Sequence, residues 1–280
     1  MNAETPSSAV RVEAAGLSHA GKVRATNEDR FAIMTVQKSV RLRATNLQDT
    51  AVLDKLGGPE VHIFVVADGM GGQPHGELAS GVAVRSVVEY LAETVNCLQD
   101  FDVEREQTFL DTLATAVWRG HERLTEMFPE PGGPATTLTM ATLIWPRAYI
   151  VHVGDSRGYF LRKGVLRQFT RDQTMGEELV DSGAFTEQQA RTAGWYRILT
   201  SGVGSALSPT VGLIDLAEGD TLLLCTDGLT RHVPDERIAA LLAAGTAGSA
   251  AQSLVDAALE AGGRDNVTVV VARAAAAAQV

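Results

Sequence analysis

The sequence predicts an α+β protein built as a layered β-sandwich flanked by helices. Its apolar runs are short and rich in β-branched residues, which is typical of buried strands. Residues 158–169 have the pattern of two strands joined by an Arg-Lys-Gly turn, so strands pair with their sequence neighbours. Two long amphipathic helical patterns follow one strand and precede several others. This order differs from the strict alternation of a parallel doubly wound fold.

Six further segments are predicted strands, because each is a short and largely apolar run: 31–36, 61–67, 138–145, 149–153, 221–226 and 267–272. Four segments carry the apolar spacing of amphipathic helices: 77–93, 104–127, 234–243 and 249–261. Pro234 suits the first turn of its helix, and Ser249 is a candidate N-cap. We expect a loop insertion at 37–60 and a mostly helical excursion between strands at 171–209.

The chain is predicted to form one domain. Its 280 residues lie near the length of about 250 residues that layered folds reach as one unit. No internal repeat, low-complexity linker or shift of composition marks a boundary within it. We expect a flexible N-terminal tail at 1–10, one domain over 11–272 and an Ala-rich C-terminal tail at 273–280.

The composition excludes several classes of function. A net charge of −10 and the lack of a basic stripe argue against nucleic acid as a partner, because such binding rests on clustered Lys and Arg. No apolar run approaches the ~20 residues that span a bilayer, and no secretion signal opens the sequence. The only cysteines, Cys97 and Cys225, predict no disulfide framework. We therefore expect a soluble, cytoplasmic protein that binds no membrane.

Acidic residues gather at the ends of the predicted strands: Glu28, Asp29, Asp68, Asp155, Asp227 and Asp265. The core behind a strand end holds it rigid, so these carboxylates converge if the sheets bring the strand ends together. Two carboxylates about 4 Å apart repel by about 4 kcal/mol near a protein surface, so a cluster needs cations. Oxygen ligands without paired His or Cys favour Mg²⁺, Mn²⁺ or Ca²⁺ over Zn²⁺. Any one Asp-Gly pair could instead be ordinary turn chemistry.

Five motifs around these acids resemble those of the metal-dependent protein serine/threonine phosphatases, the PPM or type 2C family, in its bacterial form. The resemblance covers about residues 17–272, and five motifs in the family's order are far more specific than any one of them. In chain order the motifs are Arg24-Ala25-Thr26-Asn27-Glu28-Asp29, Val66-Ala67-Asp68-Gly69-Met70-Gly71-Gly72, Val153-Gly154-Asp155-Ser156-Arg157, Thr226-Asp227-Gly228-Leu229-Thr230 and Arg264-Asp265-Asn266-Val267-Thr268.

The resemblance implies a four-layer α-β-β-α sandwich of two antiparallel sheets, with a metal cluster at one edge and a flap segment near 171–209. It implies two Mg²⁺ or Mn²⁺ ions, held by Glu28, Asp68, the carbonyl of Gly69, Asp155, Asp227 and Asp265. By similarity Asp68 would bridge two ions, and a third ion, as bacterial relatives often hold, would fall to Asp155 and Asp227. Asp29 and Asn266 would support the cluster from behind.

The activity implied by the resemblance is hydrolysis of phosphoserine and phosphothreonine in proteins by direct attack of a metal-activated water. Asp68 and Asp227 would be catalytic through the ions. Arg24 would offer its planar guanidinium to the substrate phosphate, and its alternative is a surface ion pair with Glu28. Phosphorylated proteins would be the substrates and a serine/threonine kinase the opposing partner. We expect a monomer.

Some residues depart from the family's pattern. Met70 follows Asp-Gly where some members carry a His that protonates the leaving alkoxide. His75 lies nearby and is a candidate general acid, although a lone loop His is often simply solvated; Gln73 stands where bacterial relatives often place His. Gln173 replaces another family His, and residues 194–204 depart from the usual flap pattern.

Three other interpretations compete with a phosphatase. Gly154-Asp155-Ser156-Arg157-Gly158 also matches the nucleophile elbow of serine hydrolases, but a predicted hairpin follows Ser156 where an elbow needs a helix. Residues 69–72 resemble a dinucleotide-binding turn with the wrong spacing. A non-catalytic phosphatase-like binding module is the third, and the presence of all the expected acids and of Arg24 argues against it.

Overall fold

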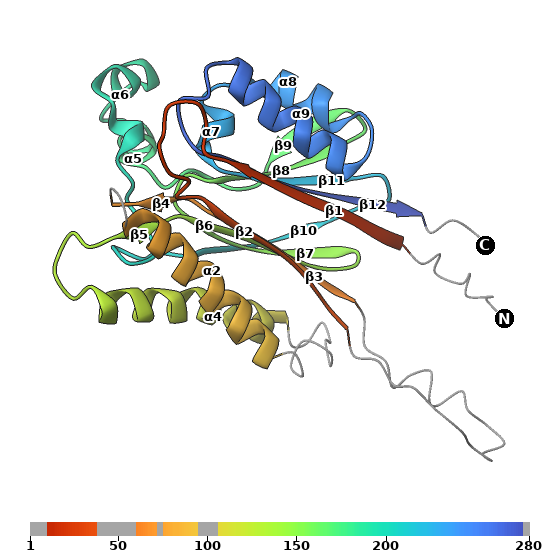
Figure 1. Ribbon diagram of the computed structural model, residues 1–280, viewed down its shortest axis with the longest axis horizontal. Coiled ribbons are helices and arrows are strands. Elements are labelled where there is room, and N and C mark those ends of the chain that lie inside the picture. The colour runs from red at the N-terminus through yellow and green to blue at the C-terminus, as the bar shows by residue number, and fades with distance from the viewer. Residues whose placement is uncertain (1–9, 38–59, 72–74, 95–105, 277–280) are drawn as a thin grey trace, which may run out of the picture.

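The computed structural model describes residues 10–37, 60–71, 75–94 and 106–276. Two β-sheets lie face to face, and a layer of helices covers the outer side of each (Figure 1). This arrangement confirms the predicted four-layer α-β-β-α sandwich. None of the helices in these ranges is both long and apolar enough to cross a membrane.

Each large sheet has five strands, and all neighbouring strands run antiparallel. The first sheet has the order β1 (Val10–His19), β12 (Val267–Ala276), β11 (Thr221–Cys225), β8 (Arg157–Arg162) and β9 (Val165–Gln168). The second has the order β10 (Thr210–Asp215), β7 (Arg147–Val153), β6 (Leu138–Ile144), β3 (Val61–Ala67) and β2 (Arg30–Val36). A small sheet joins β4 (Gly69–Met70) to β5 (Ala135–Thr136).

Three apolar layers hold these elements together. Along β3, Val65 packs under the helices α2 (His75–Glu93) and α4 (Glu106–Met127), whereas Phe64 and Val66 pack against the other sheet. Successive side chains of a strand point to opposite faces, so a strand buried on both faces reads as a continuous apolar run. The helices α8 (Asp235–Leu242) and α9 (Ala247–Glu260) cover the first sheet in the same way.

The ends of the domain differ from the prediction. Val10 already belongs to β1, and β12 continues to Ala276, so the tails predicted at 1–10 and 273–280 are wrong over these residues. Alanine favours helices, but here Ala272 and Ala274 pair with Ala14 and Val12 along the β1–β12 ladder. Strand pairing therefore overrides local propensity at this end.

Two helix starts also differ from the prediction. Thr246, not Ser249, caps α9: the Thr246 hydroxyl accepts a hydrogen bond from the Ser249 N–H, and the Ser249 hydroxyl accepts one from the Thr246 N–H at 2.8 Å. This reciprocal pair is a capping box, which satisfies two N–H groups at once. Pro234 precedes α8 as its N-cap and does not lie in its first turn.

The excursion at 171–209 contains helices, but they cover fewer than half of its residues, so the prediction of a mostly helical segment is correct only in part. It contains α5 (Met175–Asp181), α6 (Glu187–Ala193) and the short 3-10 helix η2 (Trp195–Arg197), and it projects beside α7 (Asp227–Thr230) at one end of the sandwich (Figure 1). The loop insertion predicted at 37–60 and Cys97 lie outside the described residues, apart from the flanking residues 37 and 60. Cys225 is buried and free.

Candidate active site

Carboxylates from five separate segments line one cavity of about 320 Å³ at the edge of the sandwich. They come from the β1–β2 loop, the end of β3, the β7–β8 turn, the start of α7 and the turn before β12: Glu28, Asp68, Asp155, Asp227 and Asp265. The backbone of Gly69 lines the same cavity. The structure thus brings together all six residues predicted as ligands, and their roles as ligands stay a prediction.

Burial and mutual repulsion raise the pKa values of three of these carboxyl groups, those of Asp68, Asp155 and Asp227. Burial raises the pKa of Asp68 well above its ordinary value, and the charges of Asp29 and Asp227 add to the rise. Burial likewise raises the pKa of Asp155 to about 7, with a further contribution from Asp227. The pKa of Asp227 is raised too, mainly by burial. Ionised carboxylates are unfavourable in such surroundings until a cation neutralises them.

Arginines lie among the acids. Arg231 pairs with both Asp155 and Asp227. Arg24 forms an ion pair with Asp265, with 2.9 Å between Nε and Oδ1, and its Nη2 donates a hydrogen bond to Asp265 Oδ2 at 3.0 Å. In the described part of the chain, no three His, Cys, Asp or Glu side chains lie close enough together to hold a metal ion by themselves. The carboxylates therefore share one cavity, and three of them, Asp155, Asp227 and Asp265, pair with guanidinium groups.

The donor set nevertheless fits a hard divalent ion. Asp227 Oδ1 is buried and has no hydrogen-bond partner among the described residues. Buried polar atoms are almost always paired, so an orphaned carboxylate oxygen beside other carboxylates is a natural ligand position. Carboxylates and a backbone carbonyl are the ligands that Mg²⁺ and Mn²⁺ prefer.

Glu28 and Gly69 meet at the first turn of α2, where Gly76 lies. A Cβ added at Gly76 would lie 2.6 Å from Glu28 Oε2 and 3.0 Å from the Gly69 carbonyl oxygen. A Cβ at Gly69 would lie 2.0 Å from the Gly76 carbonyl oxygen. Two glycines are therefore required for this close approach. The sequence analysis did not identify Gly76, although a Gly shortly after the Asp-Gly motif could have indicated it.

Asn266 and Asp29 support the cavity through hydrogen bonds; Asn266 also lines it, Asp29 does not, and their supporting role stays a prediction. Asn266 Oδ1 accepts a hydrogen bond from the Glu28 N–H at 2.8 Å, and its Nδ2 donates to the Ala20 and Thr26 carbonyls. Asp29 Oδ2 accepts one from the Thr226 hydroxyl at 2.8 Å, and burial raises the pKa of Asp29 to about 7. These contacts fix the loop before β2 against β12 and α7.

Arg24 differs from one expectation, because its ion pair is with Asp265 and not with Glu28. Its side chain is 56% exposed, so the guanidinium is accessible at the cavity. His75 is exposed at the start of α2, where its ring packs edge-on against Phe128 at 5.7 Å between centroids. The structure does not bring His75 into the cavity, so nothing in its position supports a role as general acid.

The structure argues against a serine hydrolase. Ser156 is fully buried, and its hydroxyl lies 2.7 Å from the Thr137 hydroxyl. The nearby His152 bonds to Thr139 and to the Arg171 carbonyl, and strand β8 follows Ser156 directly. A nucleophile elbow needs an exposed serine on a turn into a helix. Residues 154–156 therefore form a buried turn between two strands and not a nucleophile elbow.

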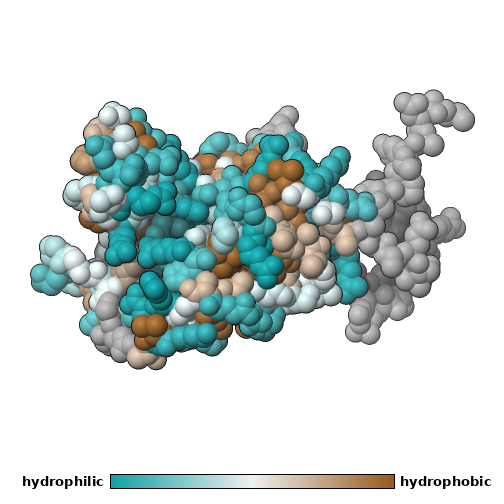
Figure 2. Space-filling model, turned by 90° about the horizontal axis from the view of Figure 1, so that it is seen from above, coloured by the Kyte–Doolittle hydropathy of each residue, from teal (hydrophilic) through white to brown (hydrophobic). Residues whose placement is uncertain are grey.

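The flap, residues 171–209, is fastened to the β7–β8 turn by two side chains. Arg157, the first residue of β8, forms a bidentate ion pair with Asp172. Gln173 Oε1 accepts a hydrogen bond from the Gly154 N–H at 2.9 Å, and its Nε2 donates to Ser208 and Thr210. A second cavity, of about 700 Å³, lies between the flap and α7, and hydrophilic side chains dominate this end of the molecule (Figure 2).

Comparisons with known proteins all identify similarity to protein phosphatases. The sequence profile of the family described as protein phosphatase 2C matches residues 36–261. The chain is 36% identical to the serine/threonine protein phosphatase PstP of Mycobacterium tuberculosis over 214 residues, which is 75% of this chain and 40% of that protein. It is 34% identical to the serine/threonine phosphatase stp of Listeria monocytogenes, over 74% of this chain and 82% of the relative. The chain thus spans well under half the length of the mycobacterial relative.

Solved structures agree with these matches. The catalytic domain of PstP in complex with 2 manganese ions aligns with a TM-score of 0.72 and 32% identity, covering 95% of this chain and 100% of that one. The serine/threonine phosphatase of S. agalactiae aligns with a TM-score of 0.75 and 26% identity, covering 94% and 99%.

Proposed function

The chain belongs to the protein phosphatase 2C family, and from this membership we propose that it hydrolyses phosphoserine and phosphothreonine in proteins with the help of divalent metal ions. The observation that carries the proposal is the cavity at the sandwich edge, which five carboxylates line and where Asp227 Oδ1 has no hydrogen-bond partner among the described residues. An apolar or nucleotide ligand would not favour such a set, whereas hard cations would.

Two Mg²⁺ or Mn²⁺ ions are the proposed cofactors. Their ligands would be Glu28, Asp68, the Gly69 carbonyl, Asp227 and Asp265, which all line the cavity. When bound, the ions would supply Lewis-acid charge to water and to the phosphate. The chain itself holds these ligands rigidly, because each stands at the end of a packed strand or in a turn fixed by hydrogen bonds such as those of Asn266.

Arg24 is the proposed phosphate-binding residue. Its guanidinium is mostly exposed and is oriented by an ion pair and a hydrogen bond to Asp265. A planar guanidinium can donate further hydrogen bonds to phosphate oxygens while it keeps such a partner. We propose that Arg24 orients the substrate phosphate over the acids, and that its loss weakens substrate binding more than it slows turnover.

Phosphorylated proteins are the proposed substrates, and a serine/threonine kinase is the proposed opposing partner. The acidic chain, with its net charge of −10, supports the view that nucleic acid is not a partner. A monomeric state and a location in the cytoplasm without membrane contact are further proposals, which rest on the sequence composition.

The direct test is release of inorganic phosphate from a phosphothreonine peptide at graded Mn²⁺ concentrations. We expect no turnover in EDTA and full recovery when Mn²⁺ is added in excess, because the carboxylates need cations to stay ionised together. Turnover that persists in EDTA would contradict a metal-dependent mechanism. Binding of Mn²⁺ without any turnover would identify a binding module in place of an enzyme.

A further inference from the structure

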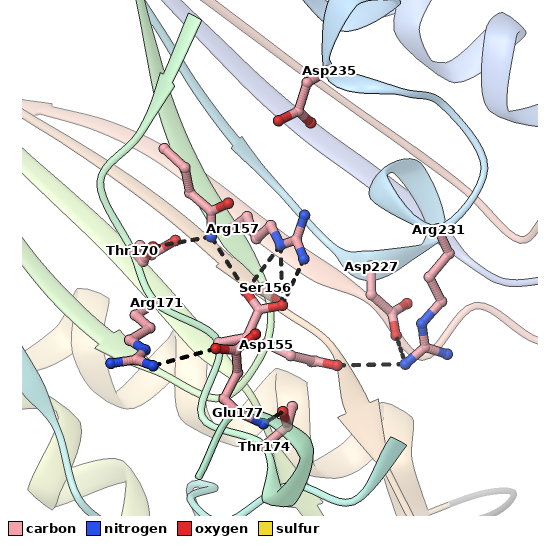
Figure 3. A network of polar contacts seen from close by, with 12 residues as sticks. Asp155, Ser156, Arg157, Thr170, Arg171, Thr174, Glu177, Asp227, Arg231 and Asp235 are labelled. Carbon is pink, nitrogen blue, oxygen red and sulfur yellow. Dashed lines mark hydrogen bonds and ion pairs between the residues drawn. The ribbon is translucent and has the colours of Figure 1, made fainter. Parts of the chain in front are cut away.

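Arg231 occupies an unusual position beside the acidic cavity. It directly follows α7, and its Nη2 lies 3.4 Å from Asp155 Oδ2 and forms a closer ion pair with Asp227 Oδ2 (Figure 3). One guanidinium nitrogen therefore bridges two carboxylates that come from distant parts of the chain. The side chains of Asp155 and Asp227 are only 10% and 11% exposed, whereas that of Arg231 is 40% exposed.

The position of Arg231 is fixed by the local backbone. Asp227 begins α7 and Arg231 caps its end, so the two side chains lie four residues apart on one helix face. The Arg231 N–H donates a hydrogen bond to the Asp227 carbonyl at 2.9 Å. The guanidinium reaches Asp155 from this anchored start, so the contact does not depend on a mobile loop.

The two carboxylate oxygens of Asp227 have different surroundings. Oδ2 pairs with Arg231, while Oδ1 is buried without a hydrogen-bond partner in the described part of the chain. Oδ1 is thus available to the ions proposed above, and Oδ2 is not. Arg231 lines both the 320 Å³ cavity and the 700 Å³ cavity beside the flap, as do Asp155 and Asp227.

We propose that the Arg231 guanidinium takes the place of a third cation between Asp155 and Asp227, so that this protein binds two divalent ions and not three. The inference rests on the proposed function, because it presupposes the two-ion centre. A divalent ion shared by these carboxylates would have to lie about 2.0–2.6 Å from their oxygens, in the space that the guanidinium fills. It would also be repelled by the arginine's fixed positive charge.

Arg231 is accordingly a positioning residue. It neutralises Asp155 and holds Asp227 with Oδ1 directed away from the pair. The third-ion site that the family resemblance implied at Asp155 and Asp227 is then closed in this chain by its own side chain. No other described arginine pairs with either of these two carboxylates.

The test counts bound ions. Mn²⁺ binding is measured by calorimetry, and by metal analysis after equilibrium dialysis at graded Mn²⁺, on the wild-type chain and on Arg231→Ala, Arg231→Lys and the double variant Arg231→Ala with Asp155→Asn. Arg123→Ala is the matched control, because Arg123 forms a similar ion pair, with Glu89 at 3.1 Å, on the helical layer. Thermal unfolding in EDTA confirms that each variant is folded.

We expect two ions per chain in the wild type, in Arg123→Ala and in Arg231→Lys, which keeps a positive charge at the site. Arg231→Ala should gain a third, weaker ion, and the double variant should lose it again. Should Arg231→Ala not fold, Arg231→Gln carries the same expectation. A third ion in the wild type, or only two in Arg231→Ala, would overturn the inference while leaving the phosphatase proposal intact. A wild type that binds no Mn²⁺ would refute the proposed function itself.

Discussion

The space between the two sheets and the acidic cavity at their edge are lined by residues close together in the sequence. The first region is stabilised by apolar packing, whereas the second holds carboxylates that need a cation. Val66 and Leu224 are at most 1% exposed and belong to the apolar layer between the sheets. Two residues beyond Val66 lies Asp68, and three beyond Leu224 lies Asp227, both in the cavity. The apolar core fixes where these carboxylates stand but does nothing to neutralise them, so only the cavity needs a partner from outside.

The largest effect is expected for Asp68→Ala, which should abolish the function of the cavity without destabilising the apolar core. We expect phosphopeptide turnover to fall by roughly 10³-fold or more, because a central electrostatic contact is removed. Thermal unfolding in EDTA should show equal or higher stability, since the substitution removes a charge from a repelling cluster. Steady-state kinetics and a melting curve check both parts. Normal turnover in this variant would count against the assignment of the site.

Leu224→Ala should destabilise the apolar core without changing the metal dependence of the cavity. Removing a fully buried side chain should lower the free energy of unfolding by about 2–5 kcal/mol. We expect the same loss in EDTA and in Mn²⁺, because Leu224 faces the space between the sheets. Urea denaturation measures it, with Val165→Ala at a 55% exposed position as the control and an expected change within about 0.5 kcal/mol. A loss that depends on Mn²⁺ would show that the two regions are coupled.

Gly76→Ala tests whether the cavity depends on close packing as well as on charge, because Gly76 carries no charged side chain. Its new Cβ would press on Glu28 Oε2 and the Gly69 carbonyl, so we expect Mn²⁺ affinity to weaken by about 10–100-fold, as when support of a ligand is lost. Gly81→Ala in the same helix is the control, because a Cβ there meets nothing within 4 Å. That control should gain up to about 1 kcal/mol in stability and keep its Mn²⁺ affinity.

A pH dependence of stability should be strongest in the metal-free protein. The pKa values of Asp29 and Asp155 are raised to about 7 in the folded chain, from ordinary values near 4. The folded state therefore binds more protons than the unfolded state in this range, and stability should fall as pH rises from about 4 to about 7. Saturating Mn²⁺ should reduce this fall, because an ion at Asp227 would neutralise a charge that raises the pKa values of both Asp29 and Asp155. Melting temperatures across this range, in EDTA and in Mn²⁺, provide the check.

The sequence predicted the parts of the fold whose local pattern and final environment agree. The strand at 61–67 was located to the residue, because it is buried on both faces and reads as one apolar run. The strands β1 and β10 were not predicted. Both are edge strands with half-exposed or exposed residues, and β10 carries Gly212 in a weakly patterned run. Their pairing is decided by the neighbouring strand, which local sequence does not contain.

In the site, too, some residues could be predicted from local sequence and others could not. The acids could be located because each follows or precedes a strong strand signal, and their convergence followed from the layered fold. Arg231 could not be recognised in this way, because α7 is a four-residue helix with no amphipathic pattern. Only the spacing of four residues from Asp227 hints at the pair. The partner, Asp155, lies in a different segment, so the bridge exists only once the chain is folded.

The pairing of β1 with β12 has a mechanical consequence. Val10 lies opposite Ala276, and ten residue pairs lead from there to His19 and Val267. Both ends of the described chain therefore leave the molecule at the same end of one antiparallel ladder, away from the flap (Figure 1). A pulling force applied at these two ends would load the hydrogen bonds one pair at a time, with Asp265 and Asn266 reached only after the whole ladder had opened.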